Sequence, residues 1–262
     1  MAQATFAQKA AKTTLFGGLV GGTFSLGCWQ TQRYGWKTEL LEKRRENLLK
    51  APLPLPAGAT TSTLPPDLAE RGRRVVVHGA YDAERTVRVG PRSPPPGLFE
   101  RAPGLGTGPQ GFTNITVMRR KDGSEVLVDR GWAPRGVETA CPTTTCEVVA
   151  VNSPGETRGT FSPENTDKHC LWVDLPFLRK QLKVADDTLL LCACPTDCKE
   201  AWPRPRAPEH LVTAAVTPQT HAGYAATWFA LSAAGAAMCV YCLLYTSPSP
   251  RDATLSRMPS SA

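Results

Sequence analysis

The chain has 262 residues, of which 41% are hydrophobic and 20% are charged, and this composition excludes a disordered, a collagen-like or a many-span membrane protein. Its net charge of +7 is modest, and no segment interleaves basic side chains with aromatic residues that would stack on bases, so no nucleic-acid partner is expected. The odd number of nine cysteines does not suit the disulfide framework of a small secreted domain.

The first predicted element is an apolar segment at residues 13–30, which carries no charged side chain. Its length is close to the roughly 20 residues that cross a bilayer and predicts a first transmembrane helix, and its glycines would let a neighbouring helix approach closely. A cleaved signal segment and a buried helix are the alternatives. The N-terminal tail before it, residues 1–12, contains lysine and threonine but no acidic residue, and we interpret it as the remnant of a mitochondrial presequence.

A helical pattern continues after this segment, from Arg33 to Lys50, and ends at the proline-rich residues 51–58. Trp29, Arg33 and Trp36 would share one face of this helix, at steps of four and three residues. We interpret this face as a surface that contacts a partner or the membrane interface.

The next part of the chain carries strand patterns separated by turn signals. Strands are predicted at residues 74–81, 84–90, 112–119, 125–130, 147–152 and 188–193. Asp122-Gly123 predicts a tight turn between the third and fourth of these strands, and Asp174 is the expected cap of a helix that runs to Lys183. Over residues 31–216 the sequence therefore predicts a soluble α+β domain dominated by an antiparallel sheet or a partly closed β-barrel.

A second uncharged segment, residues 217–244, is long enough for a second transmembrane helix. Thr217 is a favourable helix cap with proline after it, and Tyr224 and Trp228 stand where interfacial aromatic residues belong. Two spans would place both termini on one side of the membrane and the intervening domain on the other. Residues 245–262 have no periodicity, and we interpret them as a non-native or disordered tail without function.

His221 lies one residue before the apolar run of this second segment. On a helix, Ala225, Trp228 and Ser232 would follow it on the same face. An imidazole at a membrane boundary beside an aromatic ring suits a ligand of haem iron. The alternative is an interfacial histidine that hydrogen-bonds a lipid headgroup. The residues by themselves leave both interpretations open.

A cysteine cluster, Cys192, Cys194 and Cys198, offers soft thiolate ligands for Cu(I) or Zn. Its spacing lacks the paired C-x2-C of a zinc ribbon, and no histidine lies nearby in the sequence, which favours structural or incidental cysteines. The cluster leaves one alternative function open, a membrane-anchored thiol or copper-delivery protein. The sequence contains no nucleophile motif, paired-carboxylate frame or metalloprotease helix, so no enzymatic activity is predicted.

Seven short motifs follow one another along the chain. They are GCWQTQRYGWK at 27–37, PLPLP at 52–56, VVVHGAYD at 75–82, VLVDRGWAPR at 126–135, TR at 157–158 with FSPEN at 161–165, WVD at 172–174 and HAGYAATWF at 221–229. Each motif is weak by itself, but seven in this order are specific. Together they resemble the Surfeit locus protein 1 family of cytochrome c oxidase assembly factors.

The resemblance covers about residues 15–244 and implies a multi-pass protein of the mitochondrial inner membrane, with its soluble domain facing the intermembrane space. It implies a non-enzymatic, chaperone-like role, with the assembly intermediate of cytochrome c oxidase subunit 1 and the lipid bilayer as partners. Bacterial members are linked to haem a, which implies His221 as the candidate ligand of a transient haem a, with Trp228 and Tyr224 as further contacts. Gly223 departs from the family, which has glutamine there, and this would remove a polar contact.

Overall fold

The computed structural model describes residues 2–96, 98, 108–160, 162–195, 202–211 and 216–245. The chain divides into two compact units, which we call the helical unit (Met1–Leu40 with Ala214–Ala262) and the sheet unit (Leu41–Thr213). The sheet unit lies within the soluble domain predicted at residues 31–216, and the bounds of that domain stay a prediction. Of the predicted features, Cys198 and the tail beyond residue 245 lie outside the described residues.

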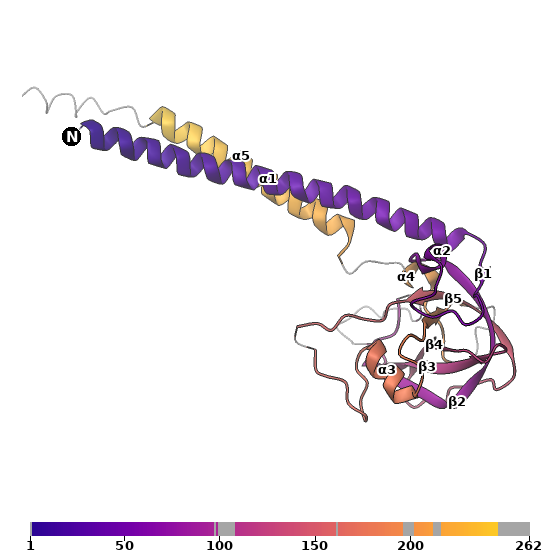
Figure 1. Ribbon diagram of the computed structural model, residues 1–262. Coiled ribbons are helices and arrows are strands. Elements are labelled where there is room, and N and C mark those ends of the chain that lie inside the picture. The colour runs from indigo at the N-terminus through magenta and orange to yellow at the C-terminus, as the bar shows by residue number, and fades with distance from the viewer. Residues whose placement is uncertain are drawn as a thin grey trace, which may run out of the picture. The chain divides into compact units, whose positions relative to one another are not determined.

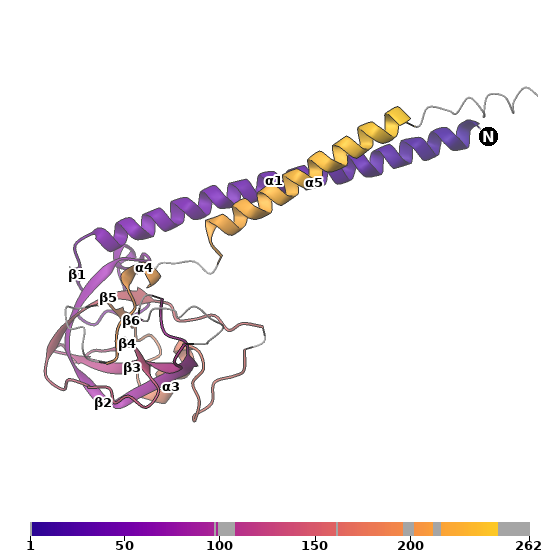
Figure 2. The same ribbon diagram turned by 180° about the vertical axis from the view of Figure 1, so that it is seen from behind.

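The helical unit contains two long helices that lie side by side and antiparallel (Figure 1, Figure 2). α1 (Ala2–Leu49) runs without a break through the predicted N-terminal tail, the first predicted span and the helix expected after it, and its part from Leu41 onward belongs to the sheet unit. α5 (Pro218–Tyr245) corresponds to the helix predicted at residues 217–244. Proline occupies its first position, where a missing N–H leaves no intrahelical hydrogen bond unmade.

Within the described residues, one helix is long and apolar enough to cross a membrane, over Pro218–Tyr241. The first predicted span, residues 13–30, is helical but does not reach that apolarity. The physical reason is its composition, because glycine, serine and threonine make up nine of its 18 residues. Length and apolarity therefore support the second predicted span, and the first is supported only as a helix.

The contact between α1 and α5 depends on small residues. Gly27 is buried, and a Cβ at this position would lie 2.6 Å from the ring of Phe229. The same ring packs against Phe24, with ring centroids 5.5 Å apart. The buried Ser232 hydroxyl donates a hydrogen bond of 3.0 Å to the Val20 carbonyl. Close approach at small residues and a hydroxyl that bonds across the pair are typical of helix packing in membranes.

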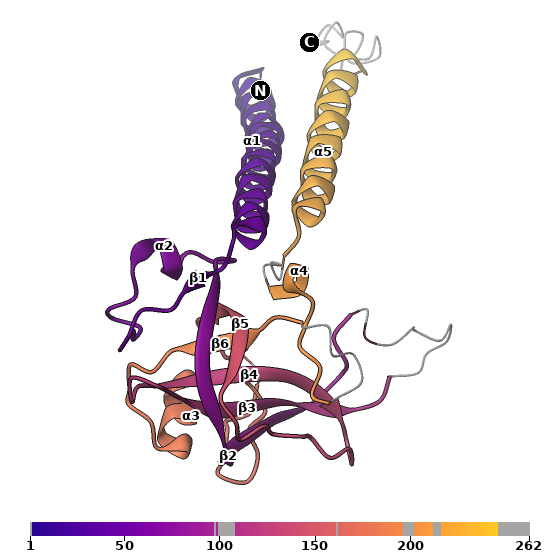
Figure 3. The same cartoon turned by 90° about the vertical axis from the view of Figure 1, so that its right-hand side faces the viewer.

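The sheet unit contains a mixed sheet of six strands (Figure 3). The strands are β1 (Leu53–Pro54), β2 (Arg74–Arg92), β3 (Gly111–Arg120), β4 (Glu125–Pro134), β5 (Cys146–Ser153) and β6 (Leu190–Ala193). Their order is β1-β2-β3-β4-β6-β5, and β5 also pairs with β2. The β1–β2 and β4–β6 pairings are parallel and the other four are antiparallel. The predicted sheet is therefore present, but it is mixed rather than purely antiparallel.

β2 joins two strands that the sequence predicted separately, at residues 74–81 and 84–90. Its pairing with β3 shifts register just after Asp82. Arg85 lies within this shift, donates a 2.8 Å hydrogen bond to Asp82 and forms an ion pair with Glu125 of β4. A bulge inserts residues into a strand without ending it. The predicted break between two strands is thus a bulge within one strand.

The predicted hairpin joins β3 and β4, and Gly123 in its turn has a φ of +79°. The described helices of the sheet unit are α2 (Pro66–Ala69), α3 (Leu175–Leu182) and α4 (Pro208–Leu211). α3 follows Asp174, as predicted, and ends where Lys183 adopts the left-handed conformation. Local signals therefore located both the hairpin and the helix.

Apolar side chains are buried on both faces of the sheet. Leu127 of β4 packs in one core cluster with Leu178 and Leu182 of α3. Its neighbours Val126 and Val128 pack in a second cluster. Because successive side chains of a strand point to opposite faces, these clusters lie on the two sides of β4. This burial on both faces fixes the position of β4, which carries the polar residue Asp129.

Candidate functional site

His221, the predicted haem ligand, lies near the start of α5, where it contacts α1. Its Nδ1 lies 2.8 Å from Oε1 of Gln30. A carboxamide oxygen accepts hydrogen bonds, so the tautomer that matches this contact carries its proton on Nδ1, and in that neutral tautomer the lone pair of the ring lies on Nε2. An imidazole that is oriented by a hydrogen bond at one nitrogen and keeps a lone pair at the other is typical of histidines that ligate metals.

The other residues predicted around His221 differ in their burial. Ala225 and Ser232, four and eleven residues further along α5, are both buried. Trp228 is partly buried, whereas Tyr224 is 56% exposed. The indole is therefore partly covered, whereas the phenol is mostly exposed.

Gln30 is a residue of this site that sequence reasoning missed. The sequence drew attention to Gly223, where the family has a glutamine, and suggested the loss of a polar contact. In the structure the carboxamide that orients His221 comes instead from α1. Gln30 does lie in the motif at residues 27–37, but its pairing with a residue so far along the chain requires the tertiary structure.

The predicted contact surface of Trp29, Arg33 and Trp36 lies on an exposed part of α1. Trp29 is 51% exposed and Trp36 is 47% exposed. The Arg33 Cζ lies 4.4 Å from the centroid of the Trp36 ring, and the Lys37 Nζ lies 5.4 Å from it. Cations at these distances interact with the negative face of an indole. The structure thus brings Arg33 and Trp36 together, while Trp29 lies one turn earlier.

The predicted cysteine cluster is divided between described and undescribed parts of the chain. Among the described residues, no three His, Cys, Asp or Glu side chains are placed to hold a metal ion, and Cys198 lies outside them. Burial raises the pKa of Cys194 to about 11, and burial together with the charge of Asp129 raises the pKa of Cys192. A raised pKa keeps a thiol protonated, whereas the thiolate is the form that binds metal or attacks.

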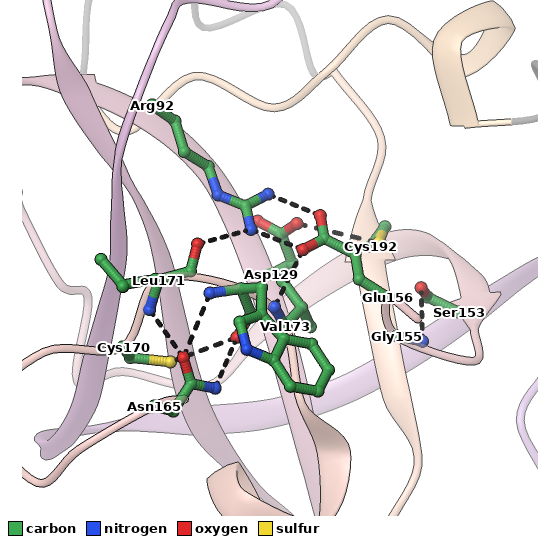
Figure 4. A network of polar contacts seen from close by, with 11 residues as sticks. Arg92, Asp129, Ser153, Gly155, Glu156, Asn165, Cys170, Leu171, Val173 and Cys192 are labelled. Atoms are coloured by element: carbon green, nitrogen blue, oxygen red, sulfur yellow. Dashed lines mark hydrogen bonds and ion pairs between the residues drawn. The ribbon is translucent and has the colours of Figure 1, made fainter. Parts of the chain in front are cut away.

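A second candidate site lies in the sheet unit, around the ion pair of Arg92 and Glu156 (Figure 4). Two guanidinium nitrogens of Arg92 each lie 2.5 Å from a carboxylate oxygen of Glu156, and Arg92 also donates to the Leu171 carbonyl at 3.2 Å. The backbone N–H of Val173 donates to Glu156 at 2.9 Å. Burial alone would raise the pKa of Glu156, but hydrogen bonds from Arg92 and its charge hold it below the usual value.

Asn165 extends this network to the neighbouring backbone (Figure 4). Its side-chain oxygen accepts hydrogen bonds from the N–H groups of Leu171, at 2.8 Å, and Trp172, at 3.3 Å. Its side-chain nitrogen donates to the Trp172 carbonyl at 3.0 Å. The motifs that end at Asn165 and begin at Trp172 therefore meet, and the network fixes their backbones against β2.

Asp129 of β4 lies in the wall of a cavity of about 140 Å³ beside this network. Its carboxylate accepts a 2.9 Å hydrogen bond from the N–H of Gly131, and the thiol of Cys192 donates to it at 3.8 Å. Burial raises the pKa of Asp129, although the charge of Arg206, which lines the same cavity, works in the opposite direction. A polar cavity of this size has room for a few water molecules.

The motif of Gly131 and Trp132 has a structural role next to this cavity. Gly131 has a φ of +112°, and a Cβ there would lie 2.1 Å from the carbonyl oxygen of Arg204. Trp132 exchanges two backbone hydrogen bonds of 2.9 Å with Arg204, and its indole N–H donates to the Arg92 carbonyl at 3.1 Å. The glycine thus allows a distant segment to pair with β4.

These observations define a class of protein, in which an apolar helix packed against a second helix carries a hydrogen-bonded histidine, and distant motifs meet in one polar network of a sheet. A family model described as the SURF1 family matches residues 18–233. The match covers most of the chain, and the chain belongs to this family. The resemblance drawn from the seven motifs is therefore confirmed.

The chain is similar to known proteins over much of its length. It is 31% identical to a SURF1-like protein of Drosophila melanogaster, over 81% of this chain and 71% of the relative. It is 27% identical to Surfeit locus protein 1 of Arabidopsis thaliana, over 81% of this chain and 72% of the relative. Over 42% of this chain and 25% of the relative, it is 33% identical to the cytochrome oxidase assembly protein SHY1 of Saccharomyces cerevisiae.

Proposed function

We propose that this chain is an assembly factor for cytochrome c oxidase in the mitochondrial inner membrane. Membership of the SURF1 family and the name of the yeast relative support this role. The length and apolarity of α5 support membrane anchoring. In this proposal the chain acts as a chaperone that holds the assembly intermediate of subunit 1, and it catalyses no reaction.

The observation that carries the proposal is the hydrogen bond between His221 and Gln30. It orients the imidazole at the start of an apolar helix and leaves Nε2 with its lone pair, which fits an axial ligand of haem iron. We infer that His221 holds haem a transiently as cargo for subunit 1. The partly buried Trp228 would supply a flat packing surface, and the exposed Tyr224 a hydroxyl for the propionates.

Haem binding is tested on the purified full-length protein by its Soret absorption and by extraction and identification of the haem. We expect haem a in the parent protein, none in His221→Ala, and less in Trp228→Ala. Gln30→Leu should reduce binding, and Gln30→Glu, which keeps an acceptor for Nδ1, should retain it. His78→Ala is the matched control because His78 is an exposed histidine of the sheet unit. Equal haem a in the parent and His221→Ala proteins would make His221 an interfacial histidine.

The proposed partner is tested by affinity purification of the tagged chain, followed by identification of the proteins that accompany it. We expect subunits of cytochrome c oxidase, and their absence would contradict the assembly role. The exposed surface of Trp29, Arg33 and Trp36 is the proposed contact. Arg33→Glu reverses the charge at the Trp36 ring and should lower the recovery of oxidase subunits while the protein stays in the membrane. Unchanged recovery would favour simple anchoring at the interface.

The proposed topology is a multi-pass chain with the sheet unit in the intermembrane space. A protease added to intact inner membranes from the intermembrane-space side should cut the sheet unit and leave both ends of the chain protected. Cleavage near the N-terminus under these conditions would contradict two spans. This measurement also tests whether the segment at residues 13–30, with its many small residues, crosses the bilayer.

The alternative function, a membrane-anchored thiol or copper-delivery protein, is less well supported. The raised pKa values of Cys192 and Cys194 disfavour their thiolates. Copper that binds to the purified protein and is lost when Cys192, Cys194 and Cys198 are replaced by serine would reverse this preference.

A further inference from the structure

Two other cysteines, Cys141 and Cys146, lie at the ends of an exposed loop in the sheet unit. The four residues between them, Pro142 to Thr145, are all exposed, whereas both cysteines are partly buried. Both pack against the same core cluster, which contains Tyr81. Both ends of the four-residue loop therefore lie against the same core cluster.

The surrounding residues hold this arrangement in place. Cys146 is the first residue of β5 and pairs in register with Gly79 of β2. On the other side, the guanidinium of Arg130 donates a hydrogen bond to the carbonyl of Ala140, directly before Cys141. The same guanidinium lies 4.9 Å from the centroid of the Tyr81 ring and is buried. Both ends of the loop are thus fixed to strands of the sheet.

The pKa of the Cys146 thiol responds to burial and to the charges around it. Burial raises the pKa of Cys146, the charge of Arg130 lowers it, and the charge of Cys141 raises it further. Burial is the largest of these effects, so the pKa of Cys146 lies above its usual value, and the guanidinium of Arg130 offsets part of that rise in favour of the reactive thiolate. Cys170 and Cys194 differ from this pair, since both are buried and burial raises the pKa of each to about 11.

We propose that Cys141 and Cys146 form a reversible disulfide through exchange with a small external disulfide of the glutathione class. This modification site is independent of the assembly role and of haem binding. A disulfide requires the two Cβ atoms to come within about 4 Å of each other, and two cysteines at the ends of a four-residue loop that both lie against one core cluster are placed to reach that separation. The exposed loop gives the external disulfide access. The bond would close a ring that holds residues 142–145 against the start of β5.

The exchange proceeds in two steps. The thiolate of one cysteine attacks a sulfur of the external disulfide, so that its S–S bond breaks, a mixed disulfide forms and one small thiolate leaves. The second cysteine thiolate attacks the protein sulfur of the mixed disulfide, which forms the Cys141–Cys146 bond and releases the second small thiolate. Two cysteine thiols are oxidised by two electrons, one external disulfide is reduced, and the two protons pass to the released thiols.

The sequence allows a direct test of this pairing. Trypsin cuts after Arg135 and Arg158, and the peptide between these sites contains Cys141 and Cys146 and no other cysteine. The full-length protein in detergent is equilibrated in buffers of increasing glutathione disulfide content, quenched with acid, alkylated and digested. We expect this peptide to change from a doubly alkylated form to an unalkylated form that is lighter than the reduced peptide by two hydrogen atoms.

Matched variants separate the pair from general thiol reactivity. In Cys141→Ser and Cys146→Ser, the remaining cysteine should carry one glutathione, because no second thiol resolves the mixed disulfide. Cys170→Ser should leave oxidation of the pair unchanged, and Cys170 should stay alkylated in the parent protein. The proposal is overturned if the peptide stays doubly alkylated in the most oxidising buffer, carries two glutathiones or is linked to another peptide. Oxidation of Cys170 in parallel would also overturn it, since the fold would then not select the pair.

Discussion

In the helical unit, large apolar side chains such as Leu19 and Met238 are 59% and 61% exposed, whereas in the sheet unit three consecutive residues of β4, Val126 to Val128, are fully buried. The helices touch through close contact at Gly27, through the Ser232 hydroxyl bonded to the Val20 carbonyl, and through the hydrogen bond between His221 and Gln30. The strands are held by backbone ladders, two apolar clusters and charged networks. The helical unit thus leaves large apolar side chains exposed and holds its helices together by a few close contacts, whereas the sheet unit buries its apolar side chains between strands and helices.

This difference is what the proposed membrane location of the helical unit predicts. A helix pair in lipid gains little from burying apolar surface, so close packing and hydrogen bonds across the pair set its association. A sheet in water is stabilised by burial of apolar surface, and its buried charges need partners. The exposed apolar residues of the helices and the paired Arg92 and Glu156 of the sheet fit these two environments. The following changes test the comparison.

The largest effect is expected for Gly131→Ala in the sheet unit. The new Cβ would lie 2.1 Å from the Arg204 carbonyl oxygen at a φ of +112°, and clash and backbone strain together should cost about 3 kcal/mol or more. Thermal unfolding in detergent, followed by near-UV circular dichroism, measures the loss. Gly136→Ala is the control, because that position has a φ of +82° but open space, and it should cost about 1 kcal/mol. Equal losses in both would show that the pairing with Arg204 matters little.

A smaller effect is expected for Gly27→Val in the helical unit. Its side chain would meet the ring of Phe229, and overpacking of this kind costs about 1–3 kcal/mol. Cross-linking between Val20→Cys and Gly235→Cys measures the pairing, since a Cβ at position 235 lies 3.0 Å from the Val20 side chain. Gly27→Val should suppress the cross-linked peptide, whereas Gly18→Val, in open space, should not. Unchanged cross-linking would mean that the helices do not depend on the close contact.

Glu156→Gln should lower the stability of the sheet unit by about 1 kcal/mol at neutral pH, a value reduced by the partial exposure of the ion pair. The pKa of Glu156 is lowered in the folded state. The stability that ionised Glu156 adds to the folded protein is therefore fully present above the pKa of the unfolded state, about 4.3. It is lost as the pH falls through the lower pKa of the folded state. Unfolding midpoints between neutral and acidic pH should converge for the parent and variant. Glu164→Gln, which breaks a more exposed pair with Arg158, should leave the midpoint unchanged.

The smallest effect is expected for Arg33→Gln, which removes one cation from the exposed Trp36 ring. An exposed contact of this kind contributes about 0.5–1 kcal/mol. Thermal unfolding should therefore change little. Any reduced recovery of oxidase subunits with Arg33→Gln would then report the contact surface itself. A large loss of stability would instead show that Arg33 is part of the packing.

Some elements of the fold were predicted correctly from neighbouring residues in the sequence, and others were not. The spacing around Asp122-Gly123 located the hairpin, Asp174 located α3, and the uncharged run located α5. In each case the deciding interactions lie within a few residues. The break predicted after Tyr81 was wrong because a bulge within one strand and a break between two strands have the same local pattern. The apolar content of residues 13–30 predicted a span, but the small residues that favour helix packing lower the apolarity on which that prediction rests.

The sequence by itself determined the order of the elements, the family and the position of His221, because periodicity, turn residues and short motifs are local properties. The tertiary structure decided which distant groups meet. It paired His221 with Gln30, Arg92 with Glu156, and β4 with β6 in parallel. Such pairings depend on the register of the strands and on how the two helices pack, and both bring together residues that lie far apart in the chain. A pattern of neighbouring residues in the sequence therefore cannot predict which distant residues meet.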